Sequence, residues 1–235
     1  MGPGTGIDRD HCVCLDPRRE RQQARLRLHD EHQDTSAPGW LRLLELVEEA
    51  AADGREVFRP LTELSPDERR QIVTLPPTIA RLTAVKHLVL YGSNLVRIPP
   101  QIGAMTALEE FSPYTSYRLH WFPYEITRCP NLTRSTVSTR ALYGNFKYRS
   151  PFPELQPEPV PPGDRGAACS VCDEPIGQAG AHQVWISLRV ATDVLPLLVN
   201  ACSPACVQAL PRPAEDYVPT PHAGGPEVVQ PGGRW

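Results

Sequence analysis

The sequence predicts a mixed α/β fold, in which a short repeat solenoid carries a helical cap at its N-terminal end and is followed by a small four-cysteine module. Three observations lead to this fold class. Apolar residues recur at helical spacing within 39–71, a proline-led apolar pattern recurs within 72–150, and two close cysteine pairs lie within 167–210. The length of 235 residues allows one or two domains, and the apolar share of 40% is enough to form a core.

The N-terminal part divides into a polar tail and two predicted helices. Residues 1–38 show no apolar period, so we expect a disordered tail there. Order should begin at Trp40, from which apolar residues recur at helical spacing up to a helix stop at Gly54. A second short helix is predicted after Ser65, which can cap it while Glu68 closes a capping box. The two helices would form the cap of the solenoid, over residues 39–71.

Three successive segments then start with the same pattern. The starts are Leu75, Ile98 and Phe122, which lie 23 and then 24 residues apart, and each is followed at once by proline and four positions later by isoleucine. Further apolar residues recur after each start: Leu82, Val85, Leu88, Leu90 and Leu95, then Met105, Leu108 and Phe111, then Cys129, Leu132, Val137 and Leu142. One unit cannot bury its own apolar face, so neighbouring units should stack, each supplying one short strand.

These units resemble the L-P-x-x-I-x-x-L-x-x-L-x-x-L-x-L-x-x-N-x-L form of bacterial leucine-rich repeat proteins, and their spacing lies within the family range of roughly 20 to 29 residues. The resemblance covers residues 72–150 and implies a curved solenoid. Ser93 stands where the asparagine ladder belongs, and Pro113 and Ser135 replace expected leucines. We therefore expect the later turns to be irregular or to serve as a cap. Chance periodicity in an ordinary α/β domain is the competing interpretation.

Strand residues between the buried positions should face the concave side of the solenoid. The repeat register places His87, Glu110 and Arg134 in one row and Tyr91 and Tyr114 in another. Tyrosine and arginine are favourable residues at protein interfaces. These five residues are the predicted partner-binding residues, and a solvated face without a dedicated partner is the alternative.

The second module is defined by Cys169 and Cys172 and by Cys202 and Cys206, with 29 residues between the two pairs. Each short spacing allows both sulfurs to point at one tetrahedral centre, and four thiolates complete a closed structural zinc site. Between the pairs, residues 184–190 alternate like a half-buried strand. The arrangement resembles a treble-clef or zinc-ribbon module, and we predict zinc as its cofactor.

Other interpretations of these cysteines are weaker. A disulfide pair suits a secreted chain, a redox pair needs a thioredoxin-like context, and a RING ligase needs eight ligands. Catalytic zinc needs an open position, which four thiolates close. His182 is the nearby alternative ligand. The module is flanked by a proline-rich linker at 151–166 and by a proline- and glycine-rich segment at 211–235, which we expect to be a disordered tail.

A second metal site could be formed near the N-terminus by Cys12 and Cys14 with His11, His29 and His32. The segment that carries them is the one least expected to fold, so we favour incidental residues.

An enzyme is the weakest of the functional hypotheses. It would use Cys129 or His120, but the sequence offers neither residue a paired base or an orienting group. Cys129 stands at a repeat leucine position, where a small buried hydrophobic residue is expected.

The formal net charge of −3 conceals a segregation of charge. Residues 72–150 hold nine Lys/Arg against three Glu, a balance of +6. Residues 39–71 hold five basic against eight acidic residues, and 167–210 hold one against three, giving −3 and −2. The acidic cysteine module lacks the basic surface that nucleic-acid binding needs. The basic repeats leave RNA or an acidic protein surface as a partner, or their charge is neutralised by the acidic cap.

Membrane and secreted proteins are disfavoured. The longest largely apolar run, Val194–Val199, is far shorter than the ~20 residues that cross a bilayer, and no signal-peptide pattern opens the chain. We predict a cytoplasmic, non-enzymatic scaffold that binds a protein partner through the concave face. The alternative is a nucleic-acid-associated factor that binds through the basic repeats.

Overall fold

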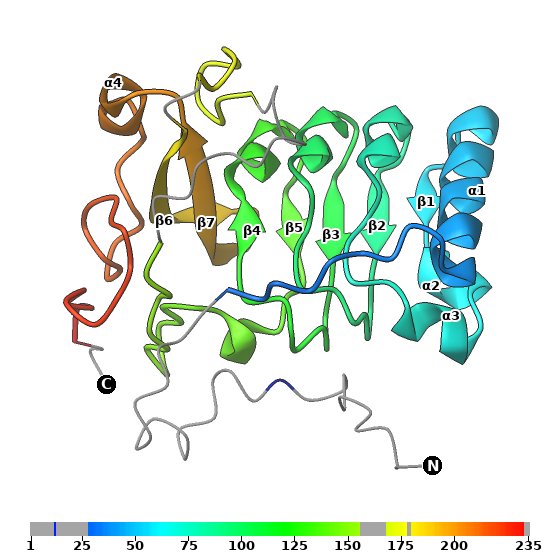
Figure 1. Cartoon of the computed structure of the whole chain (residues 1–235), viewed down its shortest axis with the longest axis horizontal. Coiled ribbons are helices and arrows are strands. Elements are labelled where there is room, and N and C mark those ends of the chain that lie inside the picture. The colour runs from blue at the N-terminus through cyan, green and yellow to red at the C-terminus, as the bar shows by residue number, and fades with distance from the viewer. Residues whose placement is uncertain (1–11, 13–27, 156–167, 178–179, 233–235) are drawn as a thin grey trace.

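Two β-sheets and a set of short helices make up the part of the chain that the computed structural model describes, residues 12, 28–155, 168–177 and 180–232 (Figure 1). One sheet is parallel, with strand order β1-β2-β3-β5, and the other combines β4 with the antiparallel pair β6 and β7. The predicted mixture of helices and strands is therefore confirmed. Helix α1 stands at one end of the parallel strands and the β6–β7 hairpin at the other (Figure 1).

Helix α1 (Pro38–Asp53) packs against α2, α3 and the first 3₁₀ helix of the repeats. It begins with a proline in its first turn, where a missing N–H costs least. Its buried face includes Leu43 and Leu46, which are fully buried. It ends at Gly54, whose φ of 65° is a conformation that glycine adopts without strain. The predicted helix and its stop are confirmed.

Two further short helices complete this end of the molecule, α2 (Pro60–Glu63) and α3 (Pro66–Arg70). The Ser65 hydroxyl accepts a hydrogen bond from the Glu68 N–H at 3.3 Å, and the Glu68 carboxylate accepts one from the Ser65 N–H at 2.7 Å. This reciprocal pair is the capping box that the sequence predicts, and it fixes the start of α3.

The parallel strands of the described chain are short: β1 (Val57–Phe58), β2 (His87–Val89), β3 (Glu110–Ser112) and β5 (Arg134–Ser135). Their register aligns Phe58 with Leu88 and Leu88 with Phe111, and all three side chains are fully buried. Successive residues of a strand point to opposite faces, so the residues that flank these positions lie on the other face of the sheet.

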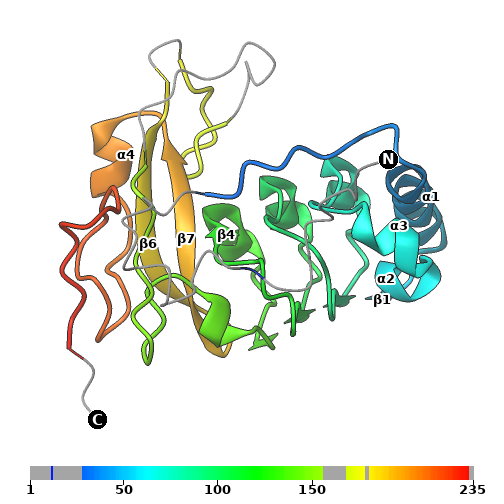
Figure 2. The same cartoon turned by 60° about the horizontal axis from the view of Figure 1, so that its bottom comes forward.

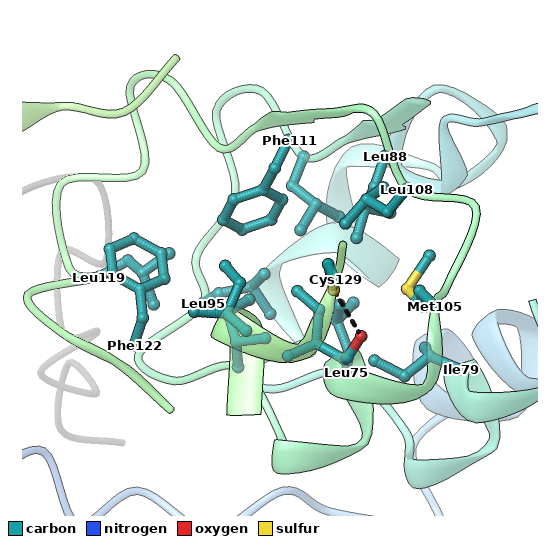
Figure 3. Packing of buried hydrophobic residues seen from close by; sticks show 14 of the residues in the cluster. Leu75, Ile79, Leu88, Leu95, Met105, Leu108, Phe111, Leu119, Phe122 and Cys129 are labelled. Carbon is teal, nitrogen blue, oxygen red and sulfur yellow. Dashed lines mark hydrogen bonds between the residues drawn. The ribbon is translucent and has the colours of Figure 1, made fainter. Parts of the chain in front are cut away.

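A 3₁₀ helix precedes each of the last three parallel strands, and a fourth follows them: η2 (Pro77–Arg81), η3 (Pro100–Ala104), η4 (Tyr124–Arg128) and η5 (Thr139–Ala141). Helix η2 packs beside η3, and η3 beside η4. The isoleucines of the three repeated starts, Ile79, Ile102 and Ile126, are fully buried. They belong to one continuous core with Met105 and Leu108, part of which Figure 3 shows.

The residues that break the repeated pattern have structural partners. The hydroxyls of Ser93 and Ser116 lie 2.6 Å apart, and Ser116 donates to the Leu90 carbonyl at 3.1 Å, so buried serines bridge neighbouring units. The Ser135 hydroxyl donates to the Asp193 carboxylate at 2.6 Å. Because Asp193 begins β7, Ser135 is the point at which the hairpin contacts the last parallel strand.

The second sheet contains β4 (Phe122–Pro123), β6 (His182–Val190) and β7 (Asp193–Ala201), and helix α4 (Pro204–Gln208) follows it. The strand predicted at 184–190 is confirmed. Strand β4 comes from the third repeated unit and pairs in parallel with β7, Phe122 aligning with Leu197. The cysteine module and the repeated units therefore share a sheet and a hydrophobic core.

The disordered tail expected at 211–235 is contradicted by the structure over 211–232, which packs against β6. Trp185 and His222 exchange two backbone hydrogen bonds of 2.8 and 3.1 Å, and Val218 is buried. Strand β6 is an edge strand whose free side needs covering. The prediction was wrong because a proline-rich segment can still hydrogen-bond to the backbone of an edge strand, even though it lacks the periodic apolar residues that reveal a packed element.

The linker expected at 151–166 starts inside a second hydrophobic cluster. Phe152 is buried against Trp185, with ring centroids 5.8 Å apart, and Leu155 belongs to the same cluster. The remainder, 156–166, lies outside the described residues. The first part of this segment is therefore core and not a spacer.

The N-terminal tail is described at Cys12 and from residue 28 onward. Residues 28–36 extend from the β4 side of the molecule toward α1 (Figures 1 and 2). The Gln33 side chain donates to the Gln71 carbonyl at 2.9 Å and accepts from the Val73 N–H at 2.9 Å. This stretch is docked on the structure, in contrast to the predicted disorder.

Candidate metal centre

The β6–β7 hairpin brings the two cysteine pairs together. Cys169 and Cys172 lie in the turn that precedes β6, Cys202 directly follows β7, and Cys206 lies in α4. Because the two strands are antiparallel, the start of β6 and the end of β7 meet, and His182 pairs with Ala201. The hairpin therefore closes the 29-residue gap between the pairs.

The four sulfurs have the spacing of a tetrahedral ligand set. The Sγ atoms of Cys172, Cys202 and Cys206 form a triangle with three edges of 3.6 Å. The Cys169 sulfur completes the group, in which all four sulfurs lie within 4.8 Å of one another. A tetrahedron with metal–sulfur bonds of about 2.3 Å has edges of about 3.8 Å. One ion can therefore contact all four sulfurs.

Backbone N–H groups favour the thiolate form of Cys169. Its sulfur faces the N–H groups of Val171 at 3.4 Å and Cys202 at 3.3 Å. Burial opposes ionisation, but hydrogen bonds from Cys172, Val171 and Cys202 outweigh it and lower the pKa of Cys169 to about 6. Such N–H donors are the partners that a metal-bound thiolate needs.

The neighbouring sulfurs oppose ionisation of Cys172. The N–H of Glu174 favours the Cys172 thiolate, but the sulfurs of Cys169, Cys202 and Cys206 raise the pKa of Cys172 to about 12. A bound metal ion removes this conflict, because it deprotonates the thiols that coordinate it. The donor chemistry of the cluster thus fits a metal ion.

Residues of the repeated units hold the first cysteine turn in place. The Ser170 hydroxyl donates to the buried Glu125 carboxylate at 2.8 Å and accepts from the Asn200 N–H at 3.0 Å. The Arg128 guanidinium donates to the Ser170 carbonyl at 2.8 Å and pairs with Asp173 at 2.6 Å. Glu125 and Arg128 belong to η4, so the first cysteine turn rests on the third repeated unit. No local pattern in the sequence signals this contact, since its partners lie 45 residues apart.

The other metal ligands that the sequence suggested lie apart from the four cysteines or outside the described residues. His182 is exposed at the start of β6 and lies outside the described metal-ligand clusters. Cys12 and His29 lie together, but their partner is His120 and not His32, which is exposed. Cys14 and His11 lie outside the described residues.

Cys129 is a buried thiol, 6% exposed, that donates to the Ile102 carbonyl at 3.3 Å (Figure 3). Burial raises the pKa of Cys129 to about 11. It is therefore held as a neutral, small core side chain, as the sequence predicts.

The five predicted partner-binding residues lie on and beside the parallel strands. The register aligns His87 with Glu110 and Glu110 with Arg134, as the repeats predict. The Glu110 carboxylate lies 3.4 Å from His87 Nδ1 and 3.1 Å from the Arg134 guanidinium. Tyr91 and Tyr114 are exposed, with ring centroids 5.7 Å apart.

No protein-family model matches the chain, and no curated protein matches it. Within the described residues, none of the helices has the length and apolar character that crossing a membrane requires.

Proposed function

We propose that this chain is a non-enzymatic, cytoplasmic scaffold of the leucine-rich-repeat kind that binds a protein partner through the exposed face of its parallel strands. The observation that carries the proposal is the alignment of His87, Glu110 and Arg134 beside the paired Tyr91 and Tyr114. Support for the repeat architecture comes from the sequence spacing of 23 and 24 residues together with the stacked 3₁₀ helices and parallel strands.

The proposed face combines charge and aromatic area on a rigid support. Tyr91 and Tyr114 are 61% and 45% exposed, and the Arg134 side chain is 61% exposed. Exposed tyrosine and arginine are residue types that contribute strongly at protein interfaces. Tyrosine buries a large area for a small loss of side-chain freedom, and arginine donates several hydrogen bonds from one planar group. The ion pair between Glu110 and Arg134 adds a pattern of charge, which favours a partner of complementary pattern.

The ion pairs favour this function over nucleic-acid binding. Four acidic residues outside the repeated units match part of their +6 charge: Arg81 pairs with Glu48, Lys86 with Glu56, Arg118 with Glu31, and Arg128 with Asp173. A phosphate-binding surface needs basic side chains that face solvent and are free to neutralise phosphates. Most of the positive excess of the repeated units is thus neutralised by ion pairs within the chain.

The proposed role of the four-cysteine centre is structural, with zinc as its ion. Four thiolates are the donor set that structural zinc prefers, and they leave no coordination position for a substrate. The contact between the cysteine turn and η4 supports a role in holding the hairpin against the end of the repeated units.

Affinity capture from the native host tests the partner face. The wild type, the triple variant Y91A/Y114A/R134A and the control Y148A are compared, Tyr148 being an exposed tyrosine away from the row. We expect the triple variant to recover a specific protein at a level lower by about tenfold or more, while Y148A recovers it like the wild type. Equal recovery by all three would exclude this face. Loss of the partner after nuclease treatment would favour the nucleic-acid alternative.

A further inference from the structure

A second cluster of metal-ligand residues lies far from the four cysteines in the sequence and joins the N-terminal segment to the repeated units. Cys12 Sγ lies 3.3 Å from His29 Nε2 and 3.1 Å from His120 Nε2. His120 is 1% exposed, and Cys12 and His29 are half-buried. We propose that Cys12, His29 and His120 bind a second zinc ion, which fastens the N-terminal segment to the rest of the chain.

The opposite side of each imidazole ring has the partner that a metal-binding histidine requires. His29 Nδ1 lies 3.0 Å from the Glu31 carboxylate, and His120 Nδ1 lies at hydrogen-bond distance from the Ala141 carbonyl. Carboxylates and carbonyls only accept, so each Nδ1 carries the proton. In the neutral imidazole each Nε2 then presents a lone pair, and both Nε2 atoms lie within 3.3 Å of the same sulfur.

This convergence of two imidazole nitrogens on one sulfur fits a zinc ion. A thiol has a single proton and can donate it to only one of the two nitrogens, whereas a zinc ion accepts from both nitrogens and from the thiolate at once. Zinc bonds of about 2.3 Å to sulfur and about 2.05 Å to nitrogen place the ligand atoms about 3.6 Å apart. The observed distances of 3.1 and 3.3 Å are within about half an ångström of that value.

The contacts around the cluster indicate which segment the ion would hold in place. Glu31, which orients His29, also pairs with the buried Arg118, and its carbonyl accepts from Arg97. Cys12 and His120 are separated by 108 positions, so one ion would close a large loop. Together with the Gln33 contacts described above, these interactions make residues 28–36 a strap along the repeated units, and the second zinc holds its N-terminal end.

Zinc content of the purified full-length chain tests the proposal, with three variants measured beside the wild type. We expect two zinc ions in the wild type, one in C12S/H29A, one in C169S/C172S, and two in H32A, which changes an exposed histidine of the same segment. His120 is left unchanged because its burial makes substitutions there prone to unfold the chain. Circular dichroism of each variant shows whether the secondary structure is retained.

Hydrogen exchange provides a readout of the strap itself. The Val73 amide donates to the Gln33 side chain, so its exchange should be faster in C12S/H29A than in wild type and unchanged in H32A. A C12S/H29A protein that keeps two zinc ions, or a wild type whose sole zinc is lost in C169S/C172S, would overturn the second site. A second equivalent identified as copper would overturn the assignment to zinc. None of these results depends on whether the tyrosine face binds a partner.

Discussion

Ser170 illustrates how single side chains connect the two parts of the chain. It stands between Cys169 and Cys172, where the sequence suggests only a turn residue, yet it is 1% exposed and hydrogen-bonded to Glu125 and Asn200. Glu125 in turn occupies a variable position of the repeat, and its burial has no signal in the sequence. A buried carboxylate needs hydrogen-bond donors, and the Ser170 hydroxyl supplies one to Glu125. The contact between the cysteine turn and η4 therefore depends on these two residues.

His222 makes the stability of the folded chain depend on pH. Its ring lies 4.6 Å from that of Phe152, and within the described chain its Nε2 is buried without a hydrogen-bond partner. Burial lowers the pKa of His222 from 6.5 to about 4. In the unfolded chain this imidazole is protonated below about pH 6.5, whereas in the folded chain it stays neutral down to about pH 4. The free energy of unfolding therefore falls as the pH drops from 6.5 to 4.

We expect urea denaturation of the wild type to show a steeper loss of stability between pH 6.5 and 4.5 than that of H222Q. The cysteine centre is the same in both proteins, so its own acid sensitivity cancels in the comparison. Identical slopes for the two proteins would contradict the burial of a neutral imidazole at this position.

At the scale of elements, the stacking of the 3₁₀ helices depends on a close approach at Gly103. A Cβ atom at this position would lie 2.7 Å from the Glu125 carbonyl oxygen, which belongs to the backbone of η4. The helices η3 and η4 would have to separate to accept it, and overpacking of this kind costs about 1–3 kcal/mol.

The substitution G103A should therefore lower the free energy of unfolding by about 1–3 kcal/mol, measured by chemical denaturation. Gly177 offers a matched control, because a Cβ atom there meets nothing within 4 Å. If G103A and G177A had equal stability, close packing of η3 on η4 would not contribute to the fold.

Elements with local signals could be predicted from the sequence, and elements with distant partners could not. The apolar spacing placed α1 and the buried positions of the repeated units, and the cysteine spacing placed the four-cysteine cluster. By contrast, β4 pairs with a strand whose residues lie 75 positions later, and no local pattern reports that contact. Ser135 looked like a defect of the repeat for the same reason, since its partner Asp193 is 58 positions away.

The candidate sites followed the same rule. The four cysteines are close in pairs, so their spacing alone was sufficient to predict that they cluster. The Cys12 cluster was only half anticipated, because His120 is 108 residues from Cys12 and lies on a different part of the fold. Composition also misled at the C-terminus, where Val218 and His222 cover the edge of β6 although the segment is rich in proline and glycine.

At the scale of the whole molecule, the helical cap, repeated units and cysteine hairpin share one hydrophobic core. The β4–β7 pairing, the Ser135 contacts and the η4 contacts join the hairpin to the repeated units at three places. Loss of the proposed metal ion should therefore loosen more than the cysteine turns, and its effect should be larger in η4 and β5 than in α1 at the far end.

Hydrogen exchange and zinc content of C169S/C172S against wild type provide the most direct test of a structural metal centre coupled to the repeated units. This variant is preferable to a chelator, which would also strip the second site. We expect the loss of one zinc equivalent and faster exchange in β6, β7 and η4, with α1 protected as in wild type. Full zinc retention, or unchanged protection of the hairpin and η4, would contradict this account.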